Sequence, residues 1–180
     1  MSAPEQLLSE PPLPAGTTRA DFWTGNCCIA CDVQTGDRRL LDVMRDATRH
    51  YLEVRRVRVS RVDAPDQVDQ AADGLLAKGD VDWIAIRAEP SRAESRLYGF
   101  VKKTPVRVLL VLESHTIQGN VFVESTATDP VGFFLRGIEK SSERFLAVGG
   151  ATIALPNGRT EQTGLAIVNR GAVRLFSVIR

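Results

Sequence analysis

Residues 25–59 read GNCCIACDVQTGDRRLLDVMRDATRHYLEVRRVRV, and residues 119–153 read GNVFVESTATDPVGFFLRGIEKSSERFLAVGGATI. The two stretches align without a gap at a constant offset of 94 residues (119 − 25 = 94). Few residues are identical, but the apolar positions coincide: Leu40 with Phe134, Met44 with Ile138, Leu52 with Leu146 and Val59 with Ile153. A repeat of this kind predicts two copies of one module of roughly 70–75 residues.

Both stretches lose their two-residue alternation at the same place. The apolar residues before Arg55 and those after Arg56 lie in opposite phases, and the second stretch slips in the same way at Gly149-Gly150. An extra residue in one strand of a pair is a β-bulge, and bulges let a small sheet curl. The pattern predicts a curled, barrel-like sheet in each copy.

The remaining elements follow from local patterns. The second copy predicts a hairpin over residues 105–125, a helix that begins at Asp129-Pro130, and strands over 145–154, 163–169 and 172–179. The first copy predicts a helix over residues 38–50 and a second helix from Ala64 to Gly79. Its first strand is unconvincing, because residues 17–22 are short and polar.

We therefore expect an α+β fold of two repeated, curled antiparallel β-modules (barrel-like), each with a short helix, related by pseudo-two-fold symmetry. The expected boundaries are a proline-rich tail at 1–16, copy one at 17–87, a linker at 88–104 and copy two at 105–180.

Composition excludes several function classes. The chain has 180 residues with a net charge of +1, so it has no bulk attraction to nucleic acid or to an anionic membrane. No apolar run approaches the roughly 18 residues of a spanning helix, and the start has no leader pattern. Arginine greatly outnumbers lysine, as in GC-rich bacterial genomes. The sequence predicts a protein of the bacterial cytoplasm without membrane contact.

Motifs for catalysis, metals or cofactors are absent from the sequence. It holds no nucleophile elbow, phosphate-binding loop, dinucleotide fingerprint or zinc-protease motif. Cys27, Cys28 and Cys31 predict small apolar packing in a reducing compartment, because His50 and His115 lack ligand spacing to them. We expect a non-enzymatic protein with no cofactor and no metal.

Arginines form the most conspicuous polar cluster. Arg55, Arg56, Arg58 and Arg61 lie on one expected strand and are typical of a phosphate-tracking surface. Acidic residues follow at once, from Asp63 to Asp82, and no aromatic side chains interleave. A salt-bridged surface is therefore favoured, and nucleic-acid binding is kept as an alternative.

Two short segments resemble the signatures of Sm-like small β-barrels: Ile117-Gln118-Gly119-Asn120-Val121 and Asn169-Arg170-Gly171-Ala172-Val173. The segment Arg39-Leu40-Leu41-Asp42 is similar to small bacterial domains with an Arg-Leu-x-Asp pattern. The resemblance implies a curled barrel, oligomerisation and an RNA contact at Arg170-Gly171. It covers about half of each copy, and a helix here replaces the central strand of that family.

The positions that the two copies share are mostly apolar core positions, and no catalytic motif is shared. The sequence therefore predicts a protein-interaction or scaffold protein. A homo-oligomer is expected, joined at the C-terminal strand edge made by Leu175, Phe176, Val178 and Ile179. A second alternative is a small-ligand-binding protein or enzyme with its site between the two copies.

Overall fold

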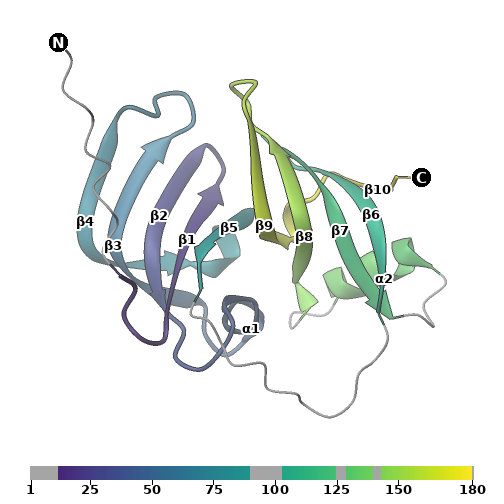
Figure 1. Cartoon of the computed structure of the whole chain (residues 1–180), viewed down its shortest axis with the longest axis horizontal. Helices are drawn as coiled ribbons and strands as arrows, with labels where there is room; N and C mark the ends of the chain where they lie inside the picture. The colour runs from purple at the N-terminus through teal and green to yellow at the C-terminus, as the bar shows by residue number, and fades with distance from the viewer. Residues whose placement is uncertain (1–11, 90–102, 125–128, 140–142, 180) are drawn as a thin grey trace.

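The computed structural model describes residues 12–89, 103–124, 129–139 and 143–179 (Figure 1). The first half holds β1 (Thr17–Thr24), β2 (Cys27–Gln34), α1 (Leu40–Arg45), β3 (Tyr51–Arg61), β4 (Val68–Ala77), the 3-10 helix η1 (Lys78–Asp80) and β5 (Trp83–Ala88). The second half holds β6 (Lys103–Val111), β7 (Thr116–Glu124), α2 (Pro130–Glu139), β8 (Phe145–Ala154), β9 (Thr160–Asn169), the 3-10 helix η3 (Arg170–Ala172) and β10 (Leu175–Val178). The same order of elements therefore occurs twice.

The ten strands in the described residues belong to one open antiparallel sheet, in the order β10-β6-β7-β8-β9-β5-β1-β2-β3-β4. The α+β expectation of two barrel-like modules with helices is wrong: the fold is all-β, the sheet is not closed, and the two α-helices are short. Figure 1 shows the first half to the left and the second half to the right of one continuous sheet. The cause is the pairing of β5 with β9, which uses one edge of each half to extend the sheet instead of closing it.

The relation between the halves is head to tail. Within each half, the fifth strand lies beside the first, and the second, third and fourth strands follow in order across the sheet. The junction pairs β9, the fourth strand of the second half, with β5, the fifth strand of the first half. A two-fold axis would pair like edges with like edges. The expected pseudo-two-fold symmetry is therefore wrong, and β4 and β10 are left as the outer strands.

Two expectations for the first half are also wrong. β1 is a full strand that pairs with both β2 and β5, and Ala20 and Phe22 on one of its faces are fully buried. The polar residues of this segment had kept it from being predicted as a strand. The segment from Ala64 to Gly79, expected as a helix, is mostly the strand β4, which pairs along the length of β3. Most side chains of β4 are exposed because it is an outer strand. Its sequence therefore lacks the alternation of buried and exposed residues from which a strand can be predicted.

The predicted bulges are confirmed. The β2–β3 register shifts between Ala30 and Asp32, and the β7–β8 register shifts between Gln118 and Asn120. At the same place in the partner strands, Arg56 and Gly150 have left-handed backbones, with φ of 51° and 57°. The offset of 94 holds for these third strands. It fails for the first hairpins, where Gly25-Asn26 forms the turn before β2 but Gly119-Asn120 lies inside β7.

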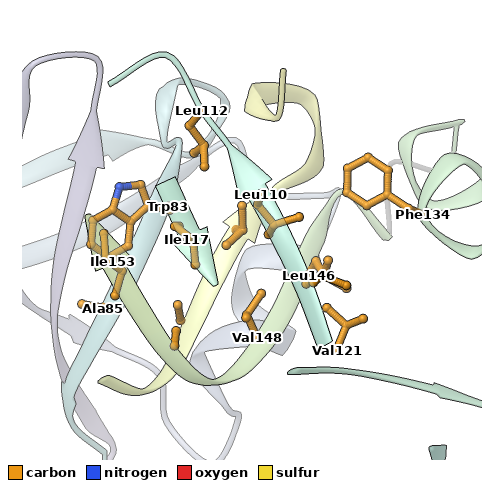
Figure 2. Packing of buried hydrophobic residues seen from close by; sticks show 14 of the residues in the cluster. Trp83, Ala85, Leu110, Leu112, Ile117, Val121, Phe134, Leu146, Val148 and Ile153 are labelled. Atoms are coloured by element: carbon orange, nitrogen blue, oxygen red, sulfur yellow. The ribbon is translucent and has the colours of Figure 1, made fainter. Parts of the chain in front are cut away.

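Two apolar cores lie against this sheet, and each receives residues from the other half. The core of the second half, seen in Figure 2, includes Trp83 and Ala85 from β5. The core of the first half includes Phe145 from β8 and Ile167 from β9. Most of the expected tail and linker, residues 1–11 and 90–102, lies outside the described residues.

Candidate functional site

The two outer strands carry large apolar side chains that face solvent. Leu75 and Val68 lie on β4, and Tyr51 lies opposite Ala77 at the start of β3. Leu175 and Val178 lie on β10. The expected oligomer edge is thus on an outer strand, and a second apolar edge, at β4, was not recognised in the sequence.

Backbone groups on both outer strands point away from the sheet. The Ile179 amide donates to the Arg107 carbonyl, so by strand alternation the amides of Phe176 and Val178 point outward. The Lys78 amide donates to the His50 carbonyl, so the Leu75 amide points outward as well. Each edge therefore offers main-chain donors to a further strand.

The two halves match residue by residue in the segment from β4 to β5. Lys78 and Arg170 each begin a 3-10 helix, at an offset of 92 (170 − 78 = 92). Lys78 Nζ donates to the carbonyls of Val43 and Asp46 near the end of α1, at 3.0 and 2.5 Å. Arg170 donates to the carbonyls of Phe133 and Phe134 in α2, at 2.9 and 3.0 Å. The same device ties each 3-10 helix to the α-helix of its own half.

Residues buried at the junction have exposed counterparts at the open edges. Phe145 is 2% exposed, but its counterpart Tyr51 (145 − 94 = 51) is 59% exposed. Ile167 is fully buried, but its counterpart Leu75 (167 − 92 = 75) is 71% exposed. In the helices the relation is reversed: Met44 is 2% exposed, and Ile138 (44 + 94 = 138) is 46% exposed. The buried member of each pair lies where the two halves meet and is covered by residues of the other half. The exposed member has no such cover in the described residues.

Four of the predicted arginines lie on β3 with exposed side chains, and the fifth, Arg170, lies in the second half. Arg55 and Arg61 are exposed and pair with Asp73 and Asp63, at 3.8 and 2.9 Å. Arg56 and Arg58 line a cavity in the first half. Arg170 is buried in the second half, where desolvation lowers its pKa to about 10. Arg170 is therefore not part of the surface that carries the four arginines of β3.

The cavity that Arg56 and Arg58 line, here named the charged pocket, has a volume of about 690 Å³. Strands β1 to β5 form it, with these residues: Arg19, Asp21, Ala30, Cys31, Asp32, Arg56, Val57, Arg58, Gln70, Ala71, Ala72 and Arg87. Alternation places Arg19 and Asp21 on the face of β1 opposite Ala20 and Phe22. The sequence had suggested only Arg56 and Arg58 of this set.

Ion pairs order the charged pocket. Asp32, with a side chain 5% exposed, accepts from Arg19 Nε at 3.0 Å and also from the Arg56 guanidinium. Arg87 bonds Asp21 at 2.6 Å and Glu161 of β9 at 3.1 Å. The Arg87 bond to Glu161 ties the pocket to the second half.

A smaller cavity, of about 380 Å³, lies between the halves near the end of α1. Two bonds cross the junction there: Arg45 donates to the Phe145 carbonyl at 2.9 Å, and Arg144 donates to the Gly79 carbonyl at 3.1 Å. Burial lowers the pKa of Arg45. These arginines are used to hold the halves together.

The cysteines are free thiols, and burial raises the pKa of both Cys28 and Cys31 to about 12. Within the described ranges no group of three or more Cys, His, Asp or Glu side chains converges as metal ligands would.

Comparison with protein-family models, with curated proteins and with solved structures finds no match to this chain. No helix in the described residues has the length and apolarity needed to span a bilayer.

Proposed function

We propose that this protein is a non-enzymatic scaffold whose copies join head to tail, with β4 of one copy pairing antiparallel with β10 of the next. One observation carries the proposal. The junction inside the chain pairs β9 with β5, and β4 and β10 are the counterparts of those two strands. Repeated head-to-tail contacts build rings or open chains.

The internal junction supplies the register. Trp83 lies opposite Val168, Ile84 opposite Ile167 and Ala85 opposite Ala166. Moving each residue by the offset of 92 places Leu175 opposite Leu76, Phe176 opposite Leu75 and Ser177 opposite Gly74 of the next copy. The outward amides of Phe176 and Leu75 suit a hydrogen-bonded pair at this position. Tyr51 and Leu75 would then be covered as Phe145 and Ile167 are.

The contact between copies is expected to be weaker than the internal junction. Inside the chain, Asn169 Nδ2 donates to the Val81 carbonyl at 2.8 Å, and Arg87 pairs with Glu161. The counterparts of Asn169 and Arg87 are Ala77 and Ile179, which have no polar side chain. We therefore expect association that depends on protein concentration.

Light scattering over a concentration series tests the assembly. The wild-type chain is expected to exceed the monomer mass at high concentration. Val178→Pro removes an outward amide and no bond to β6, so it should return the protein to monomers. Val178→Thr keeps the amide and serves as the matched control. A wild-type protein that remains a monomer of about 20 kDa well above micromolar concentration contradicts the proposal.

Mixing two blocked variants tests the polarity. Leu75→Pro blocks β4 and leaves β10 open, and Val178→Pro does the opposite. Head-to-tail pairing predicts that each variant alone is monomeric and that an equimolar mixture forms 1:1 dimers that cannot grow. If copies instead pair β10 with β10, Leu75→Pro will still dimerise, and the head-to-tail arrangement is wrong.

A further inference from the structure

We propose that the exposed apolar face of α2 packs on the outer edge of the next copy, where β3 begins and β4 ends. That edge presents Tyr51 and Leu75 to solvent. This inference rests on the proposed head-to-tail pairing of β4 with β10, and it adds a helix to a contact that the pairing assigns to strands alone. The occupant of the α2 face is a second copy of this chain.

An apolar stripe runs along α2. Val131, Leu135 and Ile138 follow one another at intervals of four and three residues, the spacing that places side chains on one face of a helix. All three are exposed, whereas Phe134 on the neighbouring face is buried in the core of the second half. A helix normally turns its apolar face toward a core. Because the described part of the chain leaves this stripe in solvent, it is a surface that another molecule would cover.

The helix α2 lies beside the outer strand β10 as α1 lies beside β5. The Phe134 ring stacks on the Phe176 ring of β10, with 4.4 Å between their centroids. The counterparts of this pair are Leu40 of α1 (134 − 94 = 40) and Ile84 of β5 (176 − 92 = 84), which share one buried core. Each helix is also bonded to the 3-10 helix of its own half. Therefore α2 has the same place at the open edge that α1 has at the internal junction.

The contacts of α1 show what a helix at this place covers. In Figure 1, α1 lies between the two halves, where it packs on β8, whereas α2 lies on the far side of the second half. Met44 of α1 shares a buried core with Phe145 of β8 and Ile167 of β9. The counterparts of these three residues are all exposed: Ile138 on α2, Tyr51 on β3 and Leu75 on β4. Pairing of β10 with β4 of another copy would bring all three together.

One polar contact of the internal junction has its donor and acceptor kept at the outer edges. Arg144 donates to the Gly79 carbonyl across the junction, at 3.1 Å. The counterparts are His50 (144 − 94 = 50) and Gly171 (79 + 92 = 171), so a ring N–H replaces the guanidinium and the carbonyl is retained. His50 is exposed beside Tyr51, and Gly171 lies in η3, which contacts α2. A donor at one outer edge thus matches an acceptor at the other, which fits a second copy of this chain.

Light scattering of variants over a concentration series tests the α2 contact. Ile138→Ser and Leu135→Ser each remove an apolar side chain from the stripe and should each weaken association about tenfold. Phe122→Ser is the matched control and should associate as the wild type does. Phe122 is about as exposed as these two residues, but it lies on β7 on the face opposite Val121, which shares the core with Phe134.

Two outcomes separate this inference from the proposed strand pairing. If Ile138→Ser and Leu135→Ser assemble as tightly as the wild type, α2 is not part of the contact, and the pairing of β4 with β10 still stands. If the wild-type chain stays monomeric, both proposals are overturned.

An exchange of charges tests which residues meet. Ile138→Lys and Tyr51→Glu should each weaken association at least tenfold, because each places a charge in an apolar contact. Both side chains are exposed in the single copy, so neither change disturbs a core. The chain with both changes carries opposite charges at facing positions of neighbouring copies, and it should associate more tightly than either single variant. If it does not, α2 does not pack on Tyr51 of the next copy and the inference is wrong.

Discussion

The guanidinium of Arg170 occupies the space that a side chain at Gly137 would fill. A Cβ at position 137 would overlap the Arg170 guanidinium, which lies over the Phe133 ring at 4.9 Å from its centroid. In an exposed helix, replacing glycine by alanine stabilises by about 1 kcal/mol. Here we expect Gly137→Ala to destabilise the protein by about 1–3 kcal/mol, because Arg170 must move and leave two carbonyls without their donor.

Urea denaturation measures this change. Gly79→Ala is a suitable control, because nothing lies within 4 Å of a Cβ at that position. If Gly137→Ala is as stable as wild type, the packing of Arg170 against α2 is not as described.

Stability is expected to fall as the pH drops from about 6.5 to about 4, because His115 is buried, with its ring edge-on to the stacked rings of Trp23 and Trp83. Desolvation lowers its pKa from 6.5 to about 4. Between these values the unfolded state binds a proton that the folded state does not, so acidification favours unfolding. At 1.36 kcal/mol per pKa unit, the loss is at most about 3 kcal/mol.

Chemical denaturation at several pH values detects this effect. His115→Phe is expected to remove this part of the pH dependence, and His50→Asn, at an exposed position, is expected to keep it. If stability depends on pH in His115→Phe as it does in the wild type, the pH dependence arises from other titratable groups.

The thiols of Cys28 and Cys31 are expected to be unreactive in the folded protein. Desolvation raises both pKa values to about 12, so the thiolate fraction at pH 8 is several hundredfold smaller than for an unperturbed thiol. Iodoacetamide labelling followed by mass spectrometry should show modification at least a hundredfold slower than in urea. Fast labelling of either residue in native buffer would show that the strands open around it.

Asp32→Ala is expected to destabilise the protein by roughly 2–3 kcal/mol, because it removes the carboxylate shared by Arg19 and Arg56. The half-exposed Arg56 can turn to solvent, which keeps the cost below that of a fully buried pair. Asp73→Ala breaks an exposed pair with Arg55 and should change stability by less than about 0.5 kcal/mol. Equal costs for the two variants would mean that the pocket network contributes no more than a surface pair.

The bulges could be predicted because they leave a mark in the sequence. A bulge shifts the phase of buried residues, and Leu52 and Val57 record that shift in the same way as Leu146 and Ala151. The strand β4 left no such mark, because its outer position gives most of its side chains no buried face. The charged pocket was missed for a related reason: residues 17–22 were judged too short and polar to form a strand, whereas Arg19 and Asp21 of this segment line the pocket.

The sequence by itself determined some local features of this protein: the places of α1 and α2, the bulges and the apolar strands that carry them, since each depends on neighbours a few residues away. The tertiary structure alone decided that the halves join head to tail. That arrangement depends on the pairing of β5 with β9, about 80 residues apart, and on burial of Phe145 and Ile167. Alternation along one strand does not identify the strand that will pair with it, because backbone hydrogen bonds are the same for every partner.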